Sequence, residues 1–262
     1  MTTALQKIGL CPVDVRKIDR YLNATRAALL FGRHVILVEG VAEMMLLPAL
    51  AKKHLVATPE ADADDVEAAR QRLRQFRNVT LISVEGVDFE PYLHLLLDGS
   101  HPRVDQVVVV TDRDKDDSGG RRQQRYETTF KSAADSKALV VCVGGTTLEA
   151  ELFRTPTNES LLRTAYLAQH PSSGSKWQKV ADKAGANEDE RAKVFAKALS
   201  GKDDSVPDLD LSKGDFAHLV SEALETPGGR DFVVPAYLVA AIEGVTQLPT
   251  SGEPSSEGQP GE

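Results

Sequence analysis

The sequence predicts an α/β fold in which a parallel sheet flanked by helices is followed by a small helical domain. Strand-like and helix-like segments alternate four times between residues 34 and 145. That order is typical of parallel strands with helices on both faces of the sheet. From Thr147 onward no convincing strand appears, and apolar residues recur at helical spacing. The 262 residues suffice to bury one large core or two small ones.

Short apolar runs bounded by polar residues and glycines mark the expected strands. The clearest are HVILV and VVVV, whose continuous apolar character is typical of strands buried on both faces. The strands are expected at 34–38, 79–84, 106–111 and 138–142. Helices are expected between them at 40–55, 58–77 and 88–99, and in a polar, Arg-rich segment that runs to about Ala134. Thr58 or an early Asp should cap the second helix, and Pro48 should kink the first.

The remaining segments suggest four parts along the chain. Helical patterns cover 158–170, 175–184, 188–200, 214–225 and 235–246. The last residues, QLPTSGEPSSEGQPGE, are rich in Pro, Gly, Ser and Glu and have little to bury. We therefore expect a linker helix at 1–32, a catalytic α/β domain at 33–153, a helical domain at 154–246 and a disordered tail at 247–262.

Composition limits the classes of protein to consider. No apolar run approaches a membrane span, and the first residues lack the layout of a secretory signal, which together predict a cytoplasmic protein. Cys11 and Cys142 stand far apart without a CxxC motif, so idle thiols are expected. The net charge of −8 argues mildly against broad neutralisation of nucleic-acid phosphates by basic residues. It is compatible with contact to phosphate through bound divalent cations, which reverse the local sign of charge.

Acidic side chains follow three of the predicted strands. The pairs are Glu39 and Glu43, Asp112 and Asp114, and Glu149 and Glu151. In a parallel α/β sheet the carboxyl ends of the strands lie at one edge, where such proteins place their chemistry. Asp112 and Asp114 are two apart in an extended segment, so both can face one cation.

Converging carboxylates repel one another unless cations separate them. Mg²⁺ or Mn²⁺ suits such a site, and two ions about 4 Å apart would stabilise both the attacking and the leaving oxygen in phosphodiester cleavage. Each signal alone has an ordinary explanation, because a Glu after a strand often opens a helix and a lone DxD also occurs in phosphatases and surface turns. Their joint occurrence at successive strand ends favours a metal site.

The same sequence segments resemble a known domain. HVILVEGVAEMMLLPALAKK and VVVVTDRD are similar to the two signature blocks of the Toprim domain, a Rossmann-like parallel sheet. RYLNATRAALLFGRHVILVEGVAEMMLLPAL, GGTTLEAEL and LSKGDFAHLV resemble the OLD (overcoming lysogenization defect) family of ATP-dependent endonucleases. The resemblance covers roughly residues 15–245 and is strongest at 21–50 and 107–114.

The resemblance implies a role for each acidic residue and for one lysine. Glu39 and Glu43 become metal ligands or water activators, Asp112 and Asp114 become central metal ligands, Glu149 and Glu151 complete a second metal, and Lys213 of LSKGDF matches a family lysine. A cation at that position stabilises phosphate charge in the transition state. An exposed lysine at a helix start is the ordinary alternative.

Family members carry an ABC-type ATPase domain ahead of the Toprim domain. This sequence contains no GxxxxGK[ST], so it resembles the C-terminal nuclease half alone. The resemblance therefore implies a DNA substrate and an ATPase domain or subunit outside this chain, with a helicase or a second copy of the chain as further partners.

The sequence thus indicates a metal-dependent DNA nuclease that nicks DNA or degrades its ends. Two alternatives stay open. A phosphatase or phosphotransferase built on the DxD would use Asp112 as nucleophile and would not need Glu39. An inactive Toprim scaffold would dimerise and hold an ATPase or helicase. The five tyrosines lie in ordinary helical contexts, which makes topoisomerase chemistry through a tyrosine nucleophile less favoured. The basic run at 121–125 fits either a DNA contact or a mixed-charge helix surface.

Overall fold

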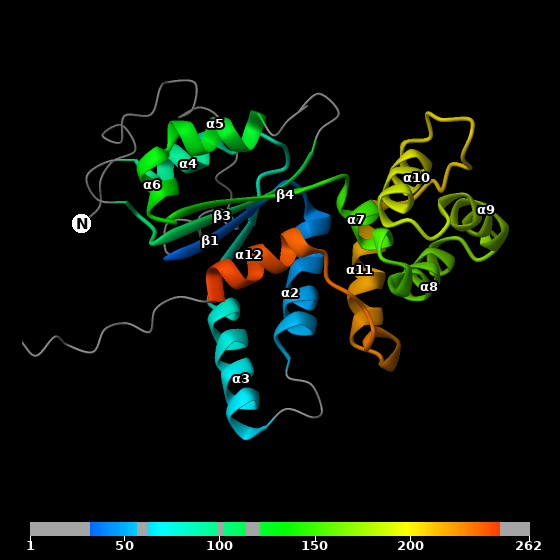
Figure 1. The fold of residues 1–262 in the computed structure, drawn as a ribbon, viewed down its shortest axis with the longest axis horizontal. Helices are drawn as coiled ribbons and strands as arrows, with labels where there is room; N and C mark the ends of the chain where they lie inside the picture. The colour runs from blue at the N-terminus through cyan, green and yellow to red at the C-terminus, as the bar shows by residue number, and fades with distance from the viewer. Residues whose placement is uncertain (1–31, 57–61, 99–101, 114–120, 247–262) are drawn as a thin grey trace, which may run out of the picture.

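A computed structural model describes residues 32–56, 62–98, 102–113 and 121–246. The predicted linker helix at 1–32 falls almost entirely outside these ranges, as do the tail at 247–262, Asp114 and Thr58. The described chain contains a sheet of parallel strands in the order β2-β1-β3-β4 (Figure 1). The strands are β1 (His34–Val38), β2 (Thr80–Ser83), β3 (Gln106–Asp112) and β4 (Leu139–Gly144). The prediction of a parallel sheet flanked by helices is confirmed.

Alternate residues of the central strands face opposite layers of helices. On one face Leu37 and Val109 pack with α4 (Glu90–Leu97), α5 (Arg121–Thr129) and α6 (Lys131–Asp135). On the other face Ile36 and Val108 pack with α2 (Val41–Leu55), α3 (Ala63–Arg77) and α12 (Ala236–Thr246). All four of these strand side chains are fully buried, which explains why the strands read as continuous apolar runs.

The helices between the sheet and α12 form a second body of the molecule (Figure 1). They are α7 (Leu148–Arg154), α8 (Glu159–Gln169), α9 (Gly174–Ala184), α10 (Glu188–Ser200) and α11 (Lys213–Leu224), with short 3₁₀ helices η3 (Pro156–Asn158) and η4 (Pro227–Gly229). Phe153 stacks on Phe195, and Trp177 meets both rings edge-on. These aromatic side chains are buried and hold α7, α9 and α10 together.

Arg191 secures the same helices from inside. Its guanidinium is nearly fully buried and donates to Glu159 Oε2 at 2.7 Å, to the carbonyl of Phe153 at 3.1 Å and to that of Gly185 at 3.0 Å. It also lies 4.2 Å from the centre of the Phe153 ring. A buried guanidinium needs all of these partners, because an unpaired buried charge is strongly destabilising.

Two helices of the C-terminal part pack against the α/β part of the molecule. α11 packs along α2, and α12 packs on β3 and β4. Figure 1 shows α12 crossing beneath the sheet beside α2. The predicted boundary between an α/β domain and a helical domain at residue 154 therefore stays a prediction, because helices from beyond it pack against the α/β part.

The predicted helices agree with the observed ones to within a few residues. Asp62 caps α3 by accepting a hydrogen bond from the Asp65 amide at 2.8 Å, in line with the expectation of an early Asp. α2 continues through Pro48 as one helix. None of the described helices is long and apolar enough to cross a membrane.

Candidate active site

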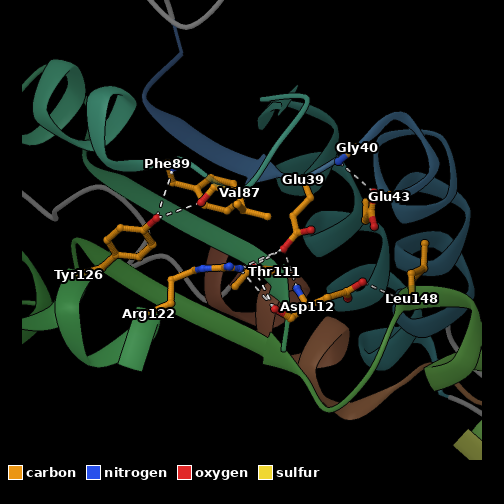
Figure 2. A network of polar contacts seen from close by, with 10 residues as sticks. All are labelled: Glu39, Gly40, Glu43, Val87, Phe89, Thr111, Asp112, Arg122, Tyr126 and Leu148. Carbon is orange, nitrogen blue, oxygen red and sulfur yellow. Dashed lines mark hydrogen bonds and ion pairs between the residues drawn. The ribbon is translucent and has the colours of Figure 1, made fainter. Parts of the chain in front are cut away.

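The carboxyl ends of β1, β3 and β4 lead into the acidic residues singled out by the sequence. The register pairs Val38 with Val110, and Asp112 with Gly144, so the three strand ends lie side by side. Parallel pairing thus brings Glu39, Asp112 and the start of α7 to one edge of the sheet (Figure 2).

Glu39 is held by groups of β3 and α5. Its Oε1 accepts hydrogen bonds from the Asp112 amide at 2.9 Å and from the Thr111 hydroxyl. The Arg122 guanidinium lies 3.5 Å from the same oxygen and donates to the Thr111 hydroxyl at 2.9 Å. Figure 2 shows this network across the end of β3. The Glu39 carboxylate is therefore fixed within contact of the Asp112 backbone.

Glu43 lies one turn into α2, where Oε2 accepts a hydrogen bond from the Gly40 amide at 3.1 Å. Burial raises the pKa of Glu43, and the charges of Glu149 and Glu39 raise it further. Asp112 receives a hydrogen bond from the Leu148 amide at the start of α7, at 3.2 Å. Burial, followed by the charges of Glu39, Glu43 and Glu149, raises the pKa of Asp112 to about 8. The four carboxylates are thus close enough for the charge of one to disfavour ionisation of another.

Glu149 of α7 and Lys213 of α11 meet at this edge of the sheet. Glu149 is 2% exposed, and neither of its oxygens has a hydrogen-bond donor of good geometry in the described chain. The Lys213 ammonium lies 3.0 Å from Oε2 as an ion pair. Burial lowers the pKa of Lys213, but Glu149, Asp112 and Glu43 outweigh this and raise it. Lys213 is placed there because α11 begins against the start of α2.

Glu151 faces other partners. Its carboxylate receives hydrogen bonds from Arg154 Nε at 2.9 Å, from Arg154 Nη2 at 3.0 Å and from the Thr146 hydroxyl at 2.7 Å. Residues two apart on a helix lie on different faces, so Glu149 and Glu151 do not point the same way from α7. The role of Glu151 as a metal ligand stays a prediction, and so does that of Asp114, which lies outside the described residues.

The donor set suits a hard divalent cation. Asp112 and Glu43 have raised pKa values, and Glu149 is buried with Lys213 as its ion-pair partner, so a cation between the three carboxylates would relieve their mutual repulsion. Among the described side chains, however, no three acidic, histidine or cysteine groups are placed to bind one ion directly. Glu39 and Glu149 instead face Arg122 and Lys213, and a bound ion would take over part of that role.

Sequence reasoning missed three residues of this site. Thr111 and Arg122 fix Glu39, and Tyr237 of α12 lies close enough for the charges of Asp112 and Glu43 to raise its pKa. The sequence interpretations of the basic run at 121–125, a DNA contact or a mixed-charge helix surface, did not include a contact between Arg122 and Glu39. Nothing in the sequence around Tyr237 distinguishes it from an ordinary helix residue.

Comparison with known proteins identifies the sheet domain. Residues 30–114 match the family model described as the Overcoming lysogenization defect protein-like TOPRIM domain. Residues 30–114 form an OLD-like Toprim domain. This Toprim domain contributes Glu39, Glu43 and Asp112, whereas Glu149 and Lys213 come from beyond the matched residues.

Solved structures show the same fold over most of the chain. The C-terminal region of the Xanthomonas campestris pv. campestris OLD protein is 23% identical, with a TM-score of 0.54, over 84% of this chain and 94% of that one. The C-terminal region of the Burkholderia pseudomallei OLD protein is 22% identical, with a TM-score of 0.52, over 83% and 98%. No curated protein matches the sequence. An OLD-like Toprim domain is consistent with a nuclease-type enzyme, and Toprim domains generally bind divalent metals.

Proposed function

We propose that the chain is a divalent-metal-dependent nuclease that hydrolyses phosphodiester bonds of DNA. The observation that carries this proposal is the meeting of Glu39, Glu43, Asp112 and Glu149 at one sheet edge, with Lys213 on the same site. Four carboxylates in one field are costly to a fold that does not use them. A bound cation would offset the repulsion among these carboxylates and would also shield a phosphate from their negative charge.

Each residue then has a role that follows from its surroundings. One or two Mg²⁺ or Mn²⁺ ions would be held by Glu39, Asp112 and Glu149. Asp114 and Glu151 are further candidate ligands. The cation would stabilise the charge that develops on the phosphate. Glu43 is suited to accept the proton of the attacking water, because burial has raised its pKa and made it a better base. Lys213 would stabilise phosphate charge in the transition state.

The partners and the wider organisation belong to the same proposal. We propose that an ATPase domain or subunit, a helicase or a second copy of the chain works with this nuclease, and that the reaction takes place in the cytoplasm. The support for these partners is the resemblance of residues 15–245 to OLD endonucleases. The division into a Toprim domain at 33–153 and a helical domain at 154–246 is proposed on the same basis.

Plasmid cleavage tests the proposal. Purified protein is incubated with supercoiled plasmid in EDTA, Mg²⁺, Mn²⁺ or Ca²⁺, and nicked and linear products are measured on a gel. We expect cleavage with Mg²⁺ or Mn²⁺ and none in EDTA. Glu39→Gln should slow it by on the order of 10²-fold or more, because the charge that a cation needs is lost.

Glu85→Gln is the matched control. Glu85 follows β2 in the words SVEG, as Glu39 follows β1 in LVEG, but it is exposed and should leave cleavage unchanged. A phosphatase would keep its activity in Glu39→Gln and would hydrolyse small phosphomonoesters. A scaffold would neither bind Mn²⁺ nor cut plasmid. Either result would overturn the proposed function.

A further inference from the structure

Tyr237 brings a hydroxyl to the acidic site from the first turn of α12. Its ring lies against Gly144 at the end of β4, so closely that a Cβ atom at Gly144 would come 3.2 Å from Cζ of the ring. The side chain as a whole is partly exposed, but its hydroxyl oxygen is buried. A side chain at position 144 would therefore press against the Tyr237 ring, which lies directly on the strand end.

Within the described ranges the Tyr237 hydroxyl has no hydrogen-bond partner. Burial raises its pKa well above the usual range, and the charges of Asp112, Glu43, Glu151 and Glu149 raise it further. A hydroxyl that only served the fold would be expected to donate to one of these nearby carboxylates, since an unpaired buried donor destabilises the folded state. It donates to none of them.

We infer that the Tyr237 hydroxyl is a hydrogen-bond donor of the acidic site, directed at the water or phosphate oxygen atoms that enter it with a divalent cation. This inference rests on the proposed function. A phenol suits the position, because it donates a proton to an electron-rich oxygen without adding charge. A tyrosine hydroxyl is protonated at neutral pH, so Tyr237 can donate to such an oxygen.

The packing of α12 fixes Tyr237 relative to the carboxylates. α12 packs on β3, which ends at Asp112, and on β4, which precedes Glu149. Leu238, Ala241, Ile242 and Val245 of the same helix are buried in the core beneath the sheet. Tyr237 is therefore anchored to the frame that carries the carboxylates, and its hydroxyl requires little reordering when a ligand binds.

Tyr237→Phe in the full chain tests the inference, with Tyr166→Phe as matched control. Tyr166 is fully buried against Trp177, and the acidic groups that influence it are Asp208 and Asp210. Thermal unfolding is followed in EDTA, and Mn²⁺ affinity is measured by calorimetry. Tyr237→Phe should leave the unfolding temperature in EDTA unchanged or higher, because it removes an unpaired donor. If the hydroxyl donates to a water of the cation, the Mn²⁺ affinity should fall about 3- to 10-fold, the equivalent of one hydrogen bond.

A second arm separates the two sources of oxygen. Binding of a short DNA duplex is measured in Ca²⁺ for the wild type and for Tyr237→Phe. A weaker Mn²⁺ affinity without DNA supports a water oxygen, and a loss confined to DNA binding supports a phosphate oxygen. The inference alone is overturned if Tyr237→Phe behaves like the wild type in both arms. It is also overturned if the unfolding temperature falls while both affinities stay unchanged, or if Tyr166→Phe loses as much affinity as Tyr237→Phe. A wild-type protein that binds no Mn²⁺ overturns the proposed function as well.

Discussion

Replacement of Asp112 by Asn should stabilise the protein in the absence of metal. The pKa of Asp112 is raised from 3.8 to about 8, so the folded state holds this proton more tightly than the unfolded state does. The stability that protonation contributes is complete below pH 4 and is lost as the pH rises through about 8. The difference between the two pKa values corresponds to about 6 kcal/mol at most. Because side chains rearrange around a buried charge, we expect about 2 kcal/mol in practice.

The assay is urea unfolding in EDTA at pH 5 and pH 8. The wild type should lose stability between these values, and Asp112→Asn should lose less and exceed the wild type at pH 8. Glu43 also has a raised pKa, so a smaller loss should persist in the variant. Asp204→Asn, an exposed aspartate with the same chemical change, is the control. Added Mn²⁺ should stabilise the wild type more than Asp112→Asn, since only the wild type keeps this ligand. Equal or lower stability of Asp112→Asn at pH 8 would refute the reasoning.

The remaining predictions concern the partners of the site and the helical part. Lys213→Ala should slow plasmid cleavage by on the order of 10²-fold, whereas Lys197→Ala should not; equal rates would remove Lys213 from the mechanism. Calorimetry of Glu151→Gln should show one bound Mn²⁺ fewer than the wild type, and an unchanged stoichiometry would exclude Glu151 as a ligand. Arg191→Met should lower the free energy of unfolding by about 3 kcal/mol in urea, because it leaves buried carbonyls without donors. A loss below about 1 kcal/mol would show that these contacts contribute little.

The sheet and the central carboxylates were predictable because they depend on local patterns. HVILV and VVVV are apolar runs of strand length, and their order along the chain requires crossover helices between parallel strands. Parallel strands end at the same edge, so Glu39 and Asp112 had to come together once the strands were placed. Glu149 follows by the same reasoning, because β4 lies next to β3.

The side-chain partners were not predictable, because they depend on packing between distant segments. Arg122 reaches Glu39 only because α5 lies over the end of β3, and its sequence context equally fits an exposed helix. Glu151 shares the word LEAEL with Glu149, yet helical geometry turns it toward Arg154. The apolar composition of α12 predicts burial on most sides but does not reveal that the sheet is the surface that buries it.

Because α12 returns to the sheet, the helices α7 to α11 form an insertion between two elements of the sheet layer. The chain leaves the sheet after β4 with α7 and rejoins it at α12, and between these points α11 packs along α2. The packing of α11 along α2, together with the return of the chain to the sheet, brings Lys213 to Glu149. Substitutions or insertions in α9 or α10, which lie far from the sheet, can therefore change the outer surface of this insertion while Lys213 keeps its position.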